Sequence, residues 1–203
     1  MQIANEKDWP AIYRLLSSKS KIFTINHKPS SYDEFAARMT SSKITDTFVE
    51  YDDDGKLLCL LMARPILNKW DIQLNSMLYH APKYVKEFLP CWYSHLTVVA
   101  NDLPLSKMYE LYAECASTGI NHYEGLGYQS FLYSNPSKYH KVLFPKLMKM
   151  STELAGYHPI KLHEIPAGTD VSQHGSFVNN LLHGVIPEQD ITISIMVKGG
   201  RPD

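Results

Sequence analysis

The chain has 203 residues, of which 44% are hydrophobic and 20% are charged, and its formal net charge is −1. This length suits one domain of ordinary size, and the hydrophobic fraction excludes global disorder. The near-zero charge gives no indication of nucleic acid or an acidic membrane surface as a partner. We therefore expect one domain over residues 1–203 that binds neither.

The start of the chain and its cysteines indicate a cytoplasmic protein. The first eight residues lack the basic start and apolar run of a signal peptide, and no apolar stretch approaches the roughly 20 residues of a membrane helix. Cys59, Cys91 and Cys115 are too far apart for a disulfide framework or a cysteine zinc site. We expect buried free thiols, and the sequence does not fix the oligomeric state.

The first forty residues predict two short helices. Ile12 and Leu15 share a helical face just after a proline, which is favoured in a first helical turn, so a helix over about 10–17 is expected. Ser31 and Glu34 have the spacing of a capping box ahead of an apolar run, which predicts a second short helix.

A strand hairpin follows. Residues 47–51 and 56–63 predict its two strands, and Gly55 supplies the positive φ that the turn between them needs. The alternating run 70–78 predicts further strand, and residues 81–90 predict a proline-bounded connection.

The middle of the chain predicts one strand followed directly by a helix. Residues 94–100 are rich in β-branched side chains, which favours a strand. A break at 101–104 precedes a helical period over 105–116, and residues 119–127 predict a turn-rich connection.

The last third predicts a strand–helix unit and two more strands. The strand-like run 128–134 ends in Asn135-Pro136-Ser137, and a helical stretch continues to about Met150. The other expected elements are strands over 158–165 and 191–197, a turn over 166–169 and one or two helical turns over 177–182.

This order of elements resembles that of the GNAT superfamily of N-acetyltransferases. The resemblance rests on the helix over 8–16 with the hairpin at 51–56, on the strand 94–100 with a helix directly behind it, and on the strand that ends at Asn135. It implies an α/β (α+β) fold, the acyl-CoA N-acyltransferase-like fold, with a mixed, mostly antiparallel central sheet and helices on both faces.

The resemblance also implies a cofactor, acetyl-CoA, in a gap where the sheet splays open between its fourth and fifth strands. The pantetheine arm would pair with the backbone of the fourth strand, and the pyrophosphate would lie on amides at the following helix N-terminus, where an anion is favoured. On this chain the implied cofactor-binding residues are Val98, Val99, Ala100, Asn101 and Asn135.

The chain departs from the family at the pyrophosphate loop. The family motif is Gln/Arg-x-x-Gly-x-Gly/Ala, whereas residues 100–107 read Ala-Asn-Asp-Leu-Pro-Leu-Ser-Lys and contain no glycine. Asp102 adds a negative charge that Lys107 partly offsets. Three interpretations stay open: the alignment is wrong by one element, the chain binds CoA atypically, or it does not bind CoA.

The family's general acid is a tyrosine one to two turns into the helix after the fifth strand. About seven residues after Asn135 this chain has 142–144, Val-Leu-Phe, which cannot donate a proton. Tyr139 is the remaining catalytic candidate, and a packing tyrosine is the other interpretation. The same helix is made basic by residues that suit a CoA 3′-phosphate or an acidic partner, although a solvated face is the commoner role: Lys138, His140, Lys141, Lys146 and Lys149.

A different chemistry is suggested by the histidines. His122 and Glu124 have the spacing of the first two ligands of a 2-His-1-carboxylate iron site, with His174 or His183 as the third. This makes an Fe(II)/2-oxoglutarate oxygenase a remote alternative. That fold has an all-β core, whereas this chain predicts many helices, so we expect no metal and solvent-facing or hydrogen-bonded histidines.

Two functions therefore lead. The first is an N-acetyltransferase that moves an acyl group from acyl-CoA to an unidentified amine, small-molecule or peptide, mainly by positioning the reactants. The second is a GNAT-fold protein without CoA binding that acts as a binding or assembly module. A gap lined by Asn135 and Tyr139 favours the enzyme, and a gap filled by large side chains favours the module.

Overall fold

The computed structural model describes residues 1–18, 31–41, 46–66, 88–170 and 189–199. Its elements in chain order are β1 (Gln2–Ile3), the 3-10 helix η1 (Glu6–Asp8), α1 (Trp9–Ser18), α2 (Tyr32–Ser41), β2 (Asp46–Tyr51), β3 (Leu57–Ile66), β4 (Cys91–Val99), α4 (Leu105–Gly125), β5 (Ser130–Pro136), α5 (Ser137–Met150), α6 (Thr152–Ala155), β6 (Tyr157–Ile165) and β7 (Ile191–Lys198). The predicted order is confirmed, and β1, η1 and α6 are additions. The predicted strand 70–78 and helical turns 177–182 lie outside the described residues, as does most of the connection 81–90.

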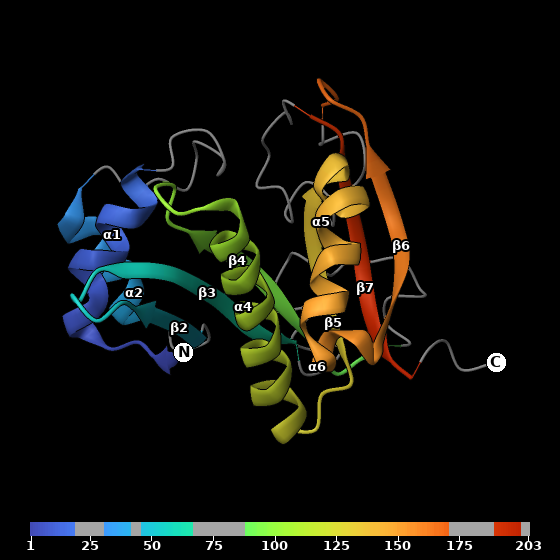
Figure 1. Ribbon diagram of the computed structural model, residues 1–203, viewed down its shortest axis with the longest axis horizontal. Coiled ribbons are helices and arrows are strands. Elements are labelled where there is room, and N and C mark those ends of the chain that lie inside the picture. Colours follow the sequence, from blue (N-terminus) through green and yellow to red (C-terminus); the bar gives the residue numbers. More distant parts are fainter. Residues whose placement is uncertain (19–30, 42–45, 67–87, 171–188, 200–203) are drawn as a thin grey trace.

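The strands form one sheet in the order β1-β2-β3-β4-β5-β7-β6. Among the described strands, β4 and β5 are the one parallel pair, and all other neighbours are antiparallel. Figure 1 shows helices α4 and α5 on the near face of this sheet. The mixed, mostly antiparallel sheet expected from the sequence is confirmed.

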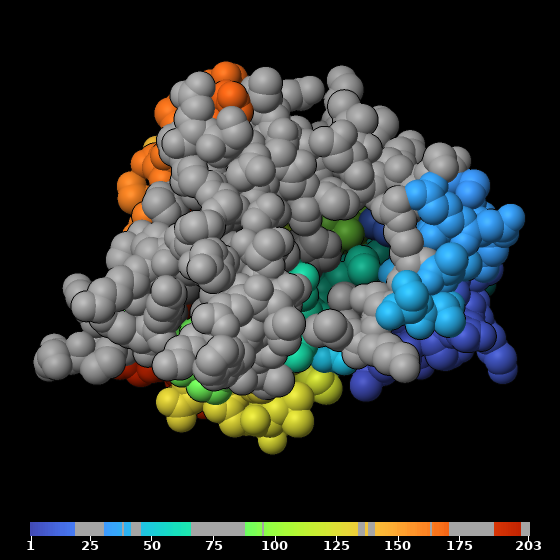
Figure 2. Space-filling model, turned by 180° about the vertical axis from the view of Figure 1, so that it is seen from behind, coloured from blue at the N-terminus to red at the C-terminus, as the bar shows by residue number. Residues whose placement is uncertain are grey.

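The two faces of the sheet have separate cores. Val49, Leu60 and Val98 point to the face covered by α1 and α2, where Ile12 and Phe35 are buried with them. A second core lies between the opposite face and helices α4 and α5. In the view from behind, α1 and α2 (blue) form one flank, and the β6 region (orange) lies at the opposite flank (Figure 2). Helices thus cover both faces, as predicted.

Local signals set most element boundaries. The Ser31 hydroxyl accepts a hydrogen bond from the Glu34 N–H at 3.2 Å, which is the N-cap half of the predicted capping box. Gly55 has a φ of 77°, and the Asp52 carboxylate accepts the Lys56 N–H at 2.8 Å within the same hairpin turn. These contacts confirm the predicted start of α2 and the predicted β2–β3 turn.

Helix α4 is longer than predicted, and the expected turn-rich connection over 119–127 is wrong for most of its length. A Cβ added to Gly119 would lie 2.8 Å from Trp92 Cη2 and 3.0 Å from Leu61 Cδ2. Gly119 therefore serves the close approach of α4 to the sheet rather than a turn. Ile120 and Tyr123, both fully buried, continue the apolar face of the helix.

Candidate functional site

The sheet opens between β4 and β5. In the described residues these strands pair only through Trp92 with Phe131 and Tyr93 with Leu132, at the start of both strands. Beyond these pairs β4 remains paired with β3, and β5 remains paired with β7, along their lengths. The two halves of the sheet therefore separate toward the C-terminal ends of β4 and β5, as Figure 1 shows.

An aromatic stack fixes the point where the halves join. The Trp92 ring stacks on Phe131, with centroids 4.6 Å apart, and on Tyr123 of α4, with centroids 4.8 Å apart. All three side chains are buried, and the Tyr123 hydroxyl donates to the Asp46 carboxylate at 2.6 Å. The junction is consequently packed from the sheet and from α4 together.

One edge of β4 faces the opening. The Ala100 N–H donates to the Leu58 carbonyl of β3 at 2.8 Å. Because the backbone groups of successive residues alternate between the two edges of a strand, those of Thr97 and Val99 point to the other edge, where β5 has diverged. Of the predicted residues on β4 and its end, Val98 and Ala100 direct their backbone toward β3.

The connection from β4 to α4 lies where the resemblance requires the pyrophosphate loop. Residues 100–104 link the two elements directly. This order contradicts the interpretation that the alignment with the family is shifted by one element. The first intrahelical hydrogen bond of α4 runs from the Met108 N–H to the Pro104 carbonyl at 3.0 Å. The amides of residues 105–107 precede that bond at the positive end of the helix dipole.

The charge of Asp102 in this loop is balanced by a different lysine from the one that the sequence suggested. The Asp102 carboxylate forms an exposed ion pair with Lys56 at the tip of the β2–β3 hairpin. Lys107, which was expected to offset Asp102, instead pairs with Glu110, with its Nζ atom 3.3 Å from the Glu110 carboxylate. The hydrogen bond to Asp102 raises the pKa of Lys56. Sequence reasoning missed Lys56 because it is 46 residues from Asp102.

The other side of the opening is the junction of β5 and α5. Asn135 pairs with Thr192 of β7, and α5 begins at Ser137, as predicted. The Ser137 N–H donates to the Asp190 carbonyl at 2.7 Å, which anchors the start of the helix on β7's side of the sheet. Tyr139 lies in the first turn of α5. The side chains of Asn135 and Tyr139 are outside the description, so their roles stay predictions.

Tyr133 is a further tyrosine beside the opening, one residue beyond the last β4–β5 pair. Its ring stacks on Phe144 of α5 with centroids 5.7 Å apart. Burial raises the pKa of Tyr133. The sequence pattern marked it only as a strand residue.

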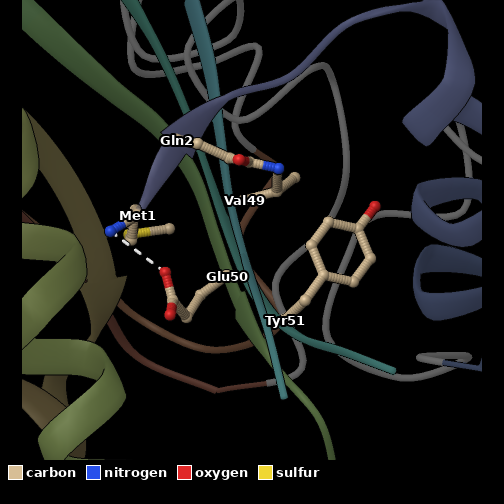
Figure 3. A pocket seen from close by; sticks show the side chains of 5 residues that line it. All are labelled: Met1, Gln2, Val49, Glu50 and Tyr51. Carbon is tan, nitrogen blue, oxygen red and sulfur yellow. Dashed lines mark ion pairs between the residues drawn. The ribbon is translucent and has the colours of Figure 1, made fainter. Parts of the chain in front are cut away.

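A pocket of about 270 Å³ lies elsewhere, on the β1–β2 edge of the sheet (Figure 3). It is lined by Met1, Gln2, Val49, Glu50 and Tyr51. The Met1 amine pairs with the Glu50 carboxylate at 3.0 Å there. None of the predicted site residues lines this pocket, and strands β2 and β3 separate it from β4.

The iron-site alternative is contradicted by the geometry. The His122 Nε2 atom lies 3.6 Å from the Asp46 carboxylate, whereas the Glu124 carboxylate accepts hydrogen bonds from Tyr157 at 2.8 Å and Lys198 at 2.6 Å. The two side chains thus serve different partners. Across the described residues no three His, Cys, Asp or Glu side chains are grouped to hold a metal ion. His174 and His183 lie outside these residues.

The three cysteines are buried free thiols, as expected. The Sγ atoms of Cys59 on β3 and Cys115 on α4 lie 3.7 Å apart within the core. Burial raises the pKa of Cys91 to about 12. In the part of the chain that the structure describes, no helix has the length and apolar character needed to cross a membrane.

Comparison with known proteins identifies the architecture. No protein-family model matches the chain, and no curated protein matches its sequence. A GNAT superfamily phosphinothricin acetyltransferase from Sinorhizobium meliloti, solved in complex with AcCoA, matches with a TM-score of 0.59 and 13% identity over 100% of this chain and 91% of that chain. A putative GNAT acetyltransferase from Desulfovibrio desulfuricans matches at 0.56 and 10% identity over 98% of each chain.

A spermidine N-acetyltransferase mutant from Vibrio cholerae also matches, with a TM-score of 0.55 and 10% identity over 97% of this chain and 93% of that chain. These matches cover nearly the whole of both chains at low identity. Such identities establish a shared fold and leave activity open. The chain is therefore a divergent protein with the fold of the GNAT superfamily.

Proposed function

We propose that this chain binds acetyl-CoA in the β4–β5 opening and transfers the acyl group to an amine. The observation that carries the proposal is the divergence of β4 from β5 after two residue pairs. It leaves the backbone of Thr97 and Val99 directed to the opening, next to the first amides of α4. An extended amide-containing arm and an anion are the ligands that these groups suit.

The loop without glycine is compatible with this ligand. Pro104 precedes α4 and has no side-chain group that could occupy the amides of residues 105–107. The ion pair with Lys56 offsets the negative charge of Asp102. The charge at this loop is therefore less unfavourable to a pyrophosphate than the sequence alone implied, although an exposed pair offsets it only modestly.

The chain's own groups divide the work as follows. Acetyl-CoA, when bound, supplies the acyl group as a thioester. The backbone of Val99 holds the arm and polarises the thioester carbonyl, while Asn101 and Asn135 contact the cofactor from the two sides of the opening. Tyr139, in the first turn of α5, is the proposed general acid for the departing thiolate. A water-mediated base takes the proton of the amine.

The acceptor is proposed as a small-molecule or peptide amine. One of the matched proteins is named as a spermidine N-acetyltransferase, an enzyme that acetylates a nitrogen of its acceptor. This supports the amine class and selects no member of it. A panel of polyamines, amino acids and peptide N-termini, read by acetyl-CoA-dependent thiol release, distinguishes the members.

A proline substitution tests the amide site. Leu105 is 62% exposed and is the first residue of α4, where proline is tolerated. Leu105→Pro removes one amide donor, and Leu105→Ala keeps it. We expect acetyl-CoA to bind Leu105→Pro about 10-fold or more weakly in calorimetric titration, as for a lost charge-assisted hydrogen bond. Equal affinities of the two variants contradict the amide site.

The second candidate function is a binding module without CoA. The absence of glycine from residues 100–107 favours it. Wild-type protein that gives no binding heat with acetyl-CoA or CoA at millimolar concentration, and no thermal shift, supports the module.

A further inference from the structure

We propose that Lys146 of α5 and Tyr109 of α4 form a subsite for a phosphate monoester, the 3′-phosphate at the nucleotide end of CoA. This inference rests on the proposed function, because it places the far end of the same ligand. It assigns a role to two side chains that the acyl-transfer chemistry does not use.

The two side chains hold each other across the seam between the helices. The Lys146 Nζ atom lies 4.6 Å from the centroid of the Tyr109 ring and 3.4 Å from its hydroxyl oxygen. A cation over an aromatic face is stabilised, so the flexible lysine side chain is held at this place. Lys146 is exposed and Tyr109 is partly exposed, which leaves the pair open to a ligand.

Among the described residues, no carboxylate forms an ion pair with the ammonium group of this pair. Within the described residues Lys146 makes no ion pair, whereas Lys56, Lys107, Lys161 and Lys198 each pair with an acidic side chain. The Tyr109 hydroxyl accepts from Lys146 and keeps its own O–H to donate, and the ammonium has further N–H groups. A phosphate oxygen is the acceptor that such a pair suits.

The position fits the two phosphate groups of one nucleotide. Tyr109 lies four residues after Leu105 on α4, so the subsite is about one helical turn, roughly 5.4 Å, from the amides proposed for the pyrophosphate. In CoA the pyrophosphate and the 3′-phosphate are carried on the same ribose. A spacing of about one turn therefore suits a single CoA molecule.

Apolar surface near the pair favours a nucleotide over an acidic protein. Leu105 is 62% exposed one turn before Tyr109, and Val142 is 57% exposed one turn before Lys146. Residues four apart share a helix face, so each helix presents an apolar side chain next to the subsite. An adenine ring has the flat apolar faces that such side chains cover.

Comparing CoA with 3′-dephospho-CoA isolates the phosphate. Calorimetric titrations of both ligands are made on wild type, on Lys146→Gln and on Lys7→Gln, which removes the same charge from an exposed lysine on η1. We expect wild type and Lys7→Gln to prefer CoA by about five- to tenfold, since one phosphate–ammonium contact is lost with dephospho-CoA. We expect Lys146→Gln to bind both ligands equally, with unchanged affinity for dephospho-CoA.

The outcomes separate this inference from the proposed function. Binding of neither ligand to wild type overturns both. Equal binding of the two ligands by wild type, or a preference that survives in Lys146→Gln, overturns the subsite and leaves CoA binding intact. An Lys146→Gln variant that weakens both ligands alike also overturns it, because the loss would then not depend on the 3′-phosphate.

Discussion

Trp92 and Phe131 stack with their ring centroids 4.6 Å apart at one of the two residue pairs that join β4 to β5. The same contact therefore closes the parallel part of the sheet and marks where the opening begins. Trp92 is also pressed against Gly119 of α4, so the junction depends on a glycine in a helix.

A double-mutant cycle measures the strength of the junction. We expect Trp92→Leu and Phe131→Leu each to lower the free energy of unfolding, with a coupling energy of about 0.5–1.5 kcal/mol, as for stacked aromatic pairs. Trp92→Leu with Phe35→Leu, on the opposite face, is the control and should be additive within about 0.5 kcal/mol. Additive effects of the first pair in urea unfolding would show that the stack does not hold the junction.

Gly119→Ala tests the contact between α4 and the sheet. The added Cβ would lie 2.8 Å from a Trp92 ring that is itself fixed by stacking, so the free energy of unfolding should fall by about 1 kcal/mol or more. Gly125→Ala, in the last turn of the same helix, meets nothing within 4 Å and should be neutral or slightly stabilising. Equal stabilities of the two variants would contradict the close packing.

Substitutions of Asp102 and Lys56 should change the affinity for acetyl-CoA in opposite directions. Asp102→Asn removes a negative charge next to the proposed pyrophosphate site, so acetyl-CoA should bind about two- to fivefold more tightly, the size of an exposed charge interaction. Lys56→Gln leaves Asp102 without this partner and should weaken binding. Both effects should shrink at high salt. Titrations in which Asp102→Asn binds acetyl-CoA more weakly than wild type would place the pyrophosphate elsewhere.

Stability should fall in alkali. Burial first, and hydrogen bonds to carboxylates for three of them, raise the pKa values of Tyr51, Tyr123, Tyr133 and Tyr157. A raised pKa contributes stability that is complete below the unfolded value near 10 and is lost as pH rises above it.

Each such tyrosine adds about 1.4 kcal/mol per pH unit to the slope of stability against pH in this range. Tyr123→Phe keeps the ring and removes the ionising group. Above pH 10 the free energy of unfolding of this variant should therefore fall less steeply with pH than that of wild type, by the contribution of one tyrosine. The ultraviolet absorbance of tyrosinate during alkaline unfolding follows the same groups. An unchanged slope in Tyr123→Phe would mean that this phenol ionises in the folded protein.

Much of the fold could be predicted because its signals are local. The helical period at Ile12 and Leu15, the cap at Ser31 and the turn at Gly55 each depend on neighbours within a few residues. The end of α4 was mispredicted because glycine is typical of turns, whereas Gly119 lies within the helix and packs against the sheet. Only the fold shows that Trp92 lies against it.

Less of the candidate site than of the fold could be predicted from the sequence. The resemblance supplied the strand and the loop, but the edge of β4 that faces the opening depends on its register with β3, which places Val99 opposite Cys59. Likewise, Lys56 meets Asp102 only because antiparallel pairing places the start of β3 beside the end of β4. Contacts between residues this far apart in the chain leave no periodic pattern.

Hydrogen exchange with and without acetyl-CoA tests the central proposal most directly, because it reports where the ligand lies. The account predicts slower exchange in peptides covering residues 94–107, which hold the exposed edge of β4 and the first amides of α4. Peptides from the Met1–Tyr51 pocket region should be unchanged. Unchanged exchange over 94–107 at saturating ligand, or protection confined to that pocket, would contradict acetyl-CoA binding in the β4–β5 opening.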